Sequence, residues 1–510
     1  MDQLRSVKRA LVALPALSLL LAAAPVSAMA ADHPDPDPPA AGGPGALSHF
    51  DLARKDCLGT AANRTSTVWF TVADGVLSDV YSPTIDNTNV ETLQYVVTDG
   101  HSFTDLQTRD MTYSVRSTDS SGMACEVTSR DKDGKYSLVT DYITDPARDS
   151  VVMRTKVVSE TPGLQVYVRY DATMNGNGGG GTDNGGADDA VVDPATTALV
   201  SSDVTPKSQA VNRDYAVPLF GALRADQPFT AAESGFVRTP SDGLTQLDDS
   251  HQLTSETTSA DQGNVVQTAR VAVGHDGTFT LALGYGQTAG DAVATAGRSA
   301  DAPFALTYQK YVKTWRTYDR SLRPPPKEAG PGGPGRGNGR SDAYYLSANV
   351  LKASEDKTFP GAVVASMASP WGQAVSAGAK PGGLPVFFES YRTVFSRDLY
   401  EAFTGFLADG DLATARDTVR FLFQRQQLAD GRFPRNSLLN GAKAPSTGGD
   451  QLDESAYPIL MAWQAGLTDD KQLYTEHIKR AADFVVAHGP SFGSERWEEQ
   501  SGYSPSTIAA

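Results

Sequence analysis

Four short segments in the C-terminal part of the sequence combine carboxylates, arginines and aromatic rings at points where a loop meets a predicted helix. Aromatic ring faces stack on the C–H surfaces of sugars, while carboxylates and guanidinium groups bind sugar hydroxyls in a bidentate manner. This combination of residue types predicts a carbohydrate site. The segments are residues 387–400, 430–434, 449–454 and 495–503.

The last segment contains two adjacent carboxylates, Glu498 and Glu499, directly after Trp497. Cleavage of a glycosidic bond with inversion needs two carboxyl groups about 6.5–9.5 Å apart, which leaves room for a water molecule. Neighbouring residues diverge on a helix and point to opposite sides of a strand, so Glu498 and Glu499 cannot flank one bond. At most one of them is a catalytic acid, and the other would raise its pKa by charge repulsion.

These residue types also have simpler interpretations. Glu498 and Glu499 suit a solvated helix start, where the helix dipole favours negative charge. Arg397 and Asp398, in the first segment, suit a surface ion pair that contributes little to stability. Composition alone favours the simpler interpretations.

The elements that must position these residues differ between the two halves of the chain. Residues 46–300 consist of short runs in which apolar and polar residues alternate, separated by Gly, Asp, Asn or Pro. This pattern predicts a large antiparallel β-domain. Within it, residues 175–189 are almost entirely Gly, Asn and Asp. We expect a flexible loop there rather than a calcium-binding repeat, because the sequence holds a single irregular copy.

A stripe of large apolar residues then marks a change to helical periodicity. Their spacing of three and four places them on one face of a helix, which we expect to pack between domains. The alternative is an aromatic face that binds sugar. Three prolines at 324–326 end this helix, and a Gly/Pro-rich linker follows at 330–339. The stripe consists of Phe304, Tyr308, Tyr311, Trp315, Tyr318 and Leu322.

After Ser341 the helical period continues. Asp411 is placed to cap the third of the predicted helices, and Ser504 followed by Pro505 is placed to begin another. Long loops separate some of these helices, and loops of this length commonly form sites. The predicted helices cover residues 342–356, 397–409, 412–427, 453–466 and 471–488, with a further start at 505.

The N-terminus has the pattern of a secretory signal. Residues 1–30 join a basic head to a short apolar run and a small-x-small cleavage pattern, and residues 31–45 are expected to form a disordered leader. The apolar run is too short to span a bilayer, although an uncleaved anchor is the alternative. We therefore expect a secreted protein that has no contact with membranes once the signal is removed.

The net charge and the cysteine content exclude some partners and sites. The chain has 44 Lys+Arg against 60 Asp+Glu, and a net charge of −16 excludes a nucleic-acid partner. Its two cysteines, Cys57 and Cys125, cannot form a four-ligand zinc site alone. They could pair in an oxidising compartment, but the sequence does not give their separation.

The order of these segments resembles the glucoamylase and glucodextranase family, glycoside hydrolase family 15, in its bacterial branch. The resemblance rests on residues 67–71, 79–86, 361–366 and 370–372 together with the aromatic helix and the site segments. It implies a multidomain β-plus-α fold: an N-terminal antiparallel β-supersandwich at 46–300, a linker helix and linker at 301–340, and an (α/α)6 barrel from 341.

The resemblance also implies roles for individual residues. Glu498 matches the general acid, and Glu499 matches the carboxylate after it that binds the sugar. Arg397 and Asp398 match a pair that grips hydroxyls of the terminal glucose, and Tyr391 matches an aromatic residue near the reaction centre. Trp497 and Phe395 are expected to shape the same pocket. Asp453 and Glu454 are compatible either with sugar contacts or with helix capping.

The implied function is a secreted, inverting exo-α-glucan glucohydrolase that releases β-D-glucose from non-reducing ends of α-1,4-linked polysaccharides or oligosaccharides. The alternatives are a glucodextranase acting on α-1,6 linkages and a non-catalytic glucan-binding or structural fragment. No cofactor is required, although the family is compatible with a structural calcium ion, and we expect a monomer.

The family's general base is a second Glu from the far half of the barrel. A barrel of six hairpins needs twelve helices, and the sequence predicts five and the start of a sixth. We therefore expect residues 341–510 to be the N-terminal half of the barrel and the chain to be truncated and inactive. The alternative is a natural short protein with another base among its own carboxylates.

Overall fold

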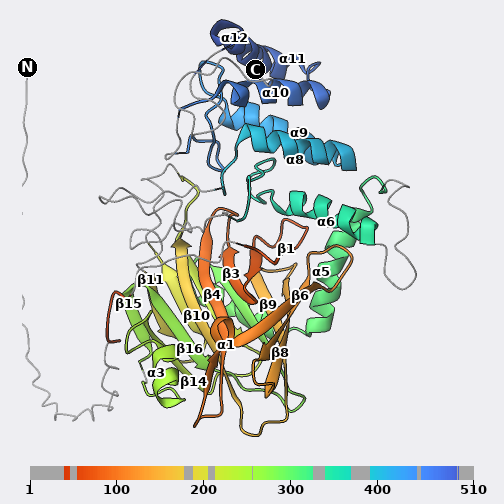
Figure 1. Cartoon of the computed structure of the whole chain (residues 1–510). Helices are drawn as coiled ribbons and strands as arrows, with labels where there is room; N and C mark the ends of the chain where they lie inside the picture. The colour runs from red at the N-terminus through yellow and green to blue at the C-terminus, as the bar shows by residue number, and fades with distance from the viewer. Residues whose placement is uncertain are drawn as a thin grey trace, which may run out of the picture. The chain divides into compact units, whose positions relative to one another are not determined.

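The computed structural model describes residues 40–45, 54–176, 188–204, 213–255, 257–325, 339–368, 391–444, 449–490 and 492. Two antiparallel sheets occupy the N-terminal part of these residues, and helices dominate the C-terminal part (Figure 1). The predicted order of a β-domain followed by a helical domain is therefore confirmed.

The first sheet has eight strands. Its apolar residues point inward, where Phe70 and Val168 pack in one core with Leu138 and Leu281 of the second sheet. The order is β1 (Cys57–Thr60), β2 (Trp69–Ala73), β3 (Val76–Tyr81), β4 (Thr88–Thr98), β10 (Gln165–Gly176), β16 (Val265–Arg270) and β14 (Ala231–Phe236), with β5 (Thr104–Leu106) paired to β4.

The second sheet has nine strands and closes the other side of this core. Its alternation is clearest in β7, where every second residue is buried, as expected of a strand with one face in the core. The order is β15 (Ser259–Gly263), β11 (Asp188–Val192), β12 (Leu199–Asp203), β13 (Leu219–Ala225), β17 (Thr278–Gly286), β9 (Ser150–Ser159), β8 (Tyr136–Thr144), β7 (Cys125–Asp131) and β6 (Met111–Ser117).

A disulfide joins the two sheets. Cys57 in β1 is bonded to Cys125 in β7, and their Cα atoms are 6.6 Å apart. The bond links residues 68 positions apart in the sequence. Because such a link restricts the unfolded chain, it stabilises the packing of one sheet on the other.

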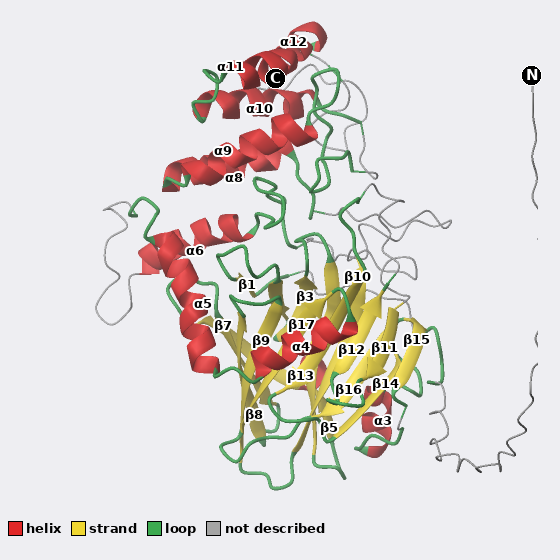
Figure 2. Cartoon of the chain, turned by 180° about the vertical axis from the view of Figure 1, so that it is seen from behind, coloured by secondary structure: helices red, strands yellow, loops and turns green. Residues whose placement is uncertain are grey.

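Short helices cover the outer faces of the sheets. The helix α4 (Ala289–Ala300) lies across β13 and β17 (Figure 2), where Ala292 and Ala296 pack on Ala222. The helix α3 (Gly243–Ser250) covers the first sheet and packs Leu247 against Val96 and Tyr167. A single turn, α1 (Gln107–Asp110), precedes β6.

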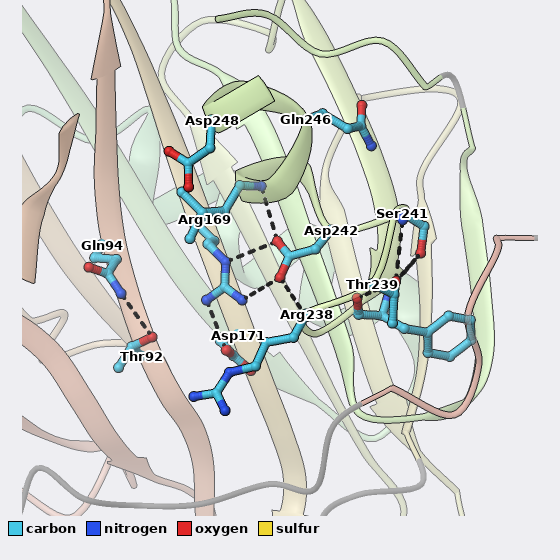
Figure 3. A network of polar contacts seen from close by, with 12 residues as sticks. Thr92, Gln94, Arg169, Asp171, Arg238, Thr239, Ser241, Asp242, Gln246 and Asp248 are labelled. Carbon is cyan, nitrogen blue, oxygen red and sulfur yellow. Dashed lines mark hydrogen bonds and ion pairs between the residues drawn. The ribbon is translucent and has the colours of Figure 1, made fainter. Parts of the chain in front are cut away.

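A buried charge network fastens α3 to the first sheet (Figure 3). The guanidinium of Arg169 on β10 donates to Asp171 at 2.9 Å and to both oxygens of Asp242 at 3.2 and 3.0 Å. Asp242 also caps α3, since its Oδ1 accepts from the backbone N–H of Leu244 at 3.0 Å. One arginine therefore compensates two buried carboxylates and fixes the start of the helix.

Glu233 on β14 lies on the same face as this network. Its register partner on β16 is Thr268, which is itself paired with Arg169 on β10. Its Oε1 accepts a hydrogen bond of 2.9 Å from Gln246 Nε2, and the side chain is buried. Burial, reinforced by the charge of Asp242, raises the pKa of Glu233 to about 8. The carboxyl is therefore protonated in the folded protein at neutral pH.

Substituting Glu233→Gln is expected to raise the free energy of unfolding at pH 8 by about 1–3 kcal/mol and to change it little at pH 4. The folded-state pKa of Glu233 lies above the ordinary value of 4.5, so the wild type loses stability as pH rises from that value through about 8. The amide still accepts from Gln246 and carries no charge at either pH. Urea unfolding at both pH values measures the difference.

The exposed Glu160, substituted as Glu160→Gln, is the matched control and should show no pH-dependent gain. An equal effect of Glu233→Gln at pH 4 and pH 8 would contradict a protonated Glu233.

The structure corrects two expectations about loops. Residues 40–45, predicted to belong to the disordered leader, are held against the β-domain: Ala41 O accepts from Ser241 Oγ at 2.6 Å, and Pro44 O accepts from Asn264 N at 2.7 Å. The expectation of disorder rested on the low apolar content of this segment, which does not indicate hydrogen bonds made by backbone carbonyls. The loop predicted at 175–189 is also shorter, because its ends belong to β10 and β11.

The aromatic residues of the stripe lie on α5 (Phe304–Asp319) and pack between the β-domain and the helices, as predicted. The helix ends at Asp319 and not at the prolines 324–326, so Leu322 lies beyond its end. Tyr311 OH donates to Met123 O at 2.6 Å, and Trp315 Nε1 donates to Thr60 O at 2.7 Å. Tyr318 OH donates to Asp411 Oδ2, on the helical side, at 2.9 Å. The alternative of an exposed sugar-binding face is wrong, because Tyr311 and Trp315 are fully buried.

The C-terminal helices start and end close to their predicted bounds. Asp411 caps α9 as predicted, accepting from Thr414 N at 3.0 Å. The linker at 330–338 and the start at 505 lie outside the described residues, as does the signal at 1–30. The helices are α6 (Gly339–Ala353), α8 (Ser396–Asp409), α9 (Leu412–Phe421), η2 (Leu422–Gln426), α10 (Leu452–Gln464), α11 (Lys471–Leu473), η3 (Tyr474–Ile478) and α12 (Lys479–His488).

No helix among the described residues combines the length and apolar character needed to cross a membrane.

Candidate functional site

Arg397 and Asp398 lie in the first turn of α8, where a loop enters the helix. The Arg397 side chain is 12% exposed and the Asp398 side chain is 41% exposed. The two charged groups are 3.9 Å apart. Arg397 is therefore anchored inside the domain while Asp398 reaches outward, so the pair is more than a surface ion pair.

The anchor of Arg397 is the start of α10. Its Nη1 donates to Glu454 Oε1 at 2.5 Å and to Gln451 Oε1 at 3.1 Å, and it lies 3.7 Å from Asp453 Oδ2. Glu454 is fully buried. Burial raises the pKa of Glu454 to about 7, while Arg397 and the hydroxyl of Ser396 act in the opposite direction.

Glu454 also caps α8, although it belongs to α10. Its Oε2 accepts from Arg397 N at 3.0 Å and from Ser396 Oγ. The residue before α8, Phe395, provides no side-chain cap. The capping interpretation of Glu454 is therefore correct for a helix other than its own, and its complete burial excludes a direct sugar contact in this arrangement.

Tyr391 begins the short non-helical segment that leads into α8. Its carbonyl accepts from Ser366 N at 3.0 Å, and that of Thr393 accepts from Ala365 N at 3.1 Å. Val394 pairs with Ser437 through two backbone hydrogen bonds of 2.9 Å. The segment is thus fixed on both sides, which gives Tyr391, Phe395 and Arg397 defined positions.

Two further predicted segments meet each other. Arg432 Nε lies 3.0 Å from Asp450 Oδ2, and Lys443 Nζ lies 2.8 Å from Asp450 Oδ1. Phe433 N donates to Ser455 Oγ at 3.1 Å. Three of the four segments that the sequence singled out are therefore joined around the start of α10. The fourth, with Trp497, Glu498 and Glu499, lies outside the described residues.

Residues of the β-domain contact the loops that lead into this site. Tyr81 on β3 is fully buried, and its hydroxyl donates to Met367 O at 2.8 Å. The guanidinium of Arg392, next to Tyr391, lies 5.5 Å from the centre of the Tyr81 ring. Asp214 of the β-domain accepts from Asn440 at 2.7 Å.

Sequence reasoning missed this support. In the sequence, the segment 79–86 contributes only to the family resemblance, and no local pattern assigns Tyr81 to a partner nearly three hundred positions later. Its only signal was a large polar aromatic residue in a strand otherwise suited to a core.

Comparison with known proteins decides the family. Residues 40–320 match the model of the glucodextranase N domain, and residues 338–510 match that of glycosyl hydrolases family 15. The chain belongs to glycosyl hydrolases family 15. The resemblance stated from the sequence is confirmed.

Two relatives extend over most of the chain. A glucoamylase from Clostridium sp. (strain G0005) is 30% identical over 475 residues, which are 92% of this chain and 61% of that protein. The crystal structure of a bacterial glucoamylase complexed with acarbose is 29% identical, with a TM-score of 0.76. This match covers 90% of this chain and 62% of the other, and it supports a β-sandwich followed by an α-barrel. The chain thus spans about three fifths of each relative's length.

Among the described residues, no group of three or more His, Cys, Asp and Glu side chains is arranged to hold a metal ion.

Substituting Tyr81→Phe is expected to lower the free energy of unfolding by about 1–3 kcal/mol, because the buried carbonyl of Met367 loses its donor. Chemical denaturation measures the loss. The matched control is Tyr113→Phe, which removes a hydroxyl that donates to Asp56 at the surface and should cost less than about 0.5 kcal/mol. Equal losses in the two variants would show that the contact between Tyr81 and Met367 does not stabilise the protein.

Proposed function

We propose that the protein is a secreted, inverting exo-acting glucohydrolase that removes β-D-glucose from the non-reducing ends of α-1,4-linked glucans. The observation that carries this proposal is the anchored Arg397–Asp398 pair in a chain of family 15. The glucoamylases among its relatives support the choice of an α-glucan as substrate.

In the proposed site, Arg397 and Asp398 bind hydroxyls of the terminal glucose. The guanidinium provides donors and the carboxylate provides acceptors, so the pair fits the alternating hydroxyls of a sugar. Tyr391 and Phe395 border the same segment, and Trp497 contributes a further ring. Glu499 binds the sugar beside the acid.

Glu498 is the proposed general acid, which protonates the glycosidic oxygen as the bond breaks. A second carboxylate, to which we assign no residue of this sequence, would activate water on the opposite face of the sugar. The reaction needs no cofactor in this scheme, and a monomer suffices. Residues 1–30 would direct the protein out of the cell.

Substituting Glu498→Gln, in protein produced from the complete coding sequence, is expected to lower kcat by roughly 10²–10⁴-fold, since the amide cannot donate the proton. Glucose release from maltotriose measures the change. The control Glu401→Gln alters an exposed carboxylate of α8 and should leave kcat within twofold. Unchanged turnover of Glu498→Gln would remove this residue from the mechanism.

Freshly released glucose is expected to be the β-anomer, because water attacks the face opposite the leaving group. Proton NMR within the first minutes of reaction distinguishes the anomers before they interconvert. The α-anomer as first product would rule out inversion.

An α-1,6-linked substrate is the second candidate, because the larger family match is to the N domain of glucodextranase. Comparing kcat/KM for maltotriose and isomaltotriose decides between the two linkages. Retention on glucan without release of glucose from either would instead identify a binding protein.

A further inference from the structure

Glu454 holds Arg397 through contacts that involve both oxygens of its carboxylate. Oε1 accepts from Arg397 Nη1 at 2.5 Å, while Oε2 accepts from Arg397 N at 3.0 Å and from Ser396 Oγ. Ser396 Oγ also lies 2.7 Å from the carbonyl oxygen of Glu454, so its single hydroxyl proton is shared between the two acceptors. Backbone and side chain of Arg397 are therefore fixed by the same carboxylate.

The electrostatic setting explains why a carboxylate occupies this position. Both α8 and α10 begin here, and neither preceding residue, Phe395 or Gln451, gives its helix a side-chain cap. Unsatisfied N–H groups at helix starts favour a negative charge. Two such starts and one guanidinium converge on Glu454, and together they offset part of the cost of burying its charge.

The contacts also restrict how Arg397 can be oriented. The partners at the start of α10, namely Glu454, Gln451 and Asp453, all lie at Nη1, whereas Nε faces Asp398 at 3.9 Å. Holding one corner of the planar guanidinium sets the direction of the remaining N–H groups. The orientation of the proposed sugar-binding group is thus set from within the domain.

We propose that Glu454 is a positioning residue that orients Arg397 for sugar binding. This inference rests on the proposed function of the Arg397–Asp398 pair. Glu454 cannot itself reach a sugar, because its side chain is completely buried. It acts only through Arg397, and this dependence separates the proposal from a general role in packing α8 on α10.

A double-mutant cycle tests the dependence, with acarbose as the probe and protein from the complete coding sequence. Glu454→Gln is expected to weaken acarbose binding about 10–100-fold, because an amide must turn a donor toward either the N–H or the guanidinium of Arg397. In an Arg397→Ala background the same substitution should change the dissociation constant less than threefold. Isothermal titration calorimetry measures all four proteins, and Glu401→Gln serves as the control.

The outcomes separate this inference from the proposed function. If the wild type and Glu454→Gln bind acarbose equally well, only the positioning role of Glu454 is overturned. An equal loss in both backgrounds also overturns it, because Glu454 would then act independently of Arg397. A wild type that fails to bind acarbose overturns both proposals.

If Glu454→Gln does not fold by circular dichroism, Glu454→Asp takes its place. The shorter side chain keeps the charge but withdraws it by one methylene from Arg397. It should weaken binding at least fivefold in the presence of Arg397 and less than twofold in its absence. Any other ordering of these two effects contradicts the proposal.

Discussion

One apolar core that continues from the β-domain into the helices is the constraint on which the rest of the structure depends. Three residues of the β-domain belong to the core of the helices and not to that of the sandwich: Trp69, Tyr81 and Ile85. They pack with helical-domain residues such as Val363, Phe403 and Phe406. The indole of Trp69 also donates to Ala353 O at 2.9 Å. Burial of large aromatic groups on both sides of the junction stabilises each half by the presence of the other.

Charged groups at this junction are compatible with the core because each has a defined partner. Lys357 is partly buried, with its Nζ 2.5 Å from both Thr60 Oγ1 and Ser66 O, and 4.8 Å from the centre of the Trp69 ring. Burial lowers its pKa to about 7 and raises that of Asp356 to about 7. Asp356 accepts from Ile85 N at 3.0 Å. Asp356 and Lys357 thus join the helical part to the β-domain through polar contacts alongside the apolar ones.

The sequence predicted those features that arise from local periodicity. Alternation predicted the β-domain, the spacing of Phe304 to Tyr318 predicted α5 and its packing, and Asp411 predicted the start of α9. Each of these features depends on residues a few positions apart. The pairing of the site segments did not follow from such patterns. Glu454 caps a helix that begins 58 positions earlier, and Tyr81 meets a carbonyl 286 positions later. Such contacts depend on how elements pack, and one sequence contains no periodic signal for them. The family resemblance indicated Arg397 and Asp398, but only the structure shows what holds them.

The continuous core has a consequence for how such a protein can evolve. A substitution that enlarges Ile85 must be matched by a smaller group among its helical neighbours, because a close-packed interior does not absorb extra volume. Recombination could exchange the β-domain for that of a distant homologue. The β-domain and helical surfaces at the junction would then lack the matched substitutions that allow them to pack together. The two halves are therefore expected to be inherited as one unit, with compensating substitutions across the junction, and not shuffled as separate modules.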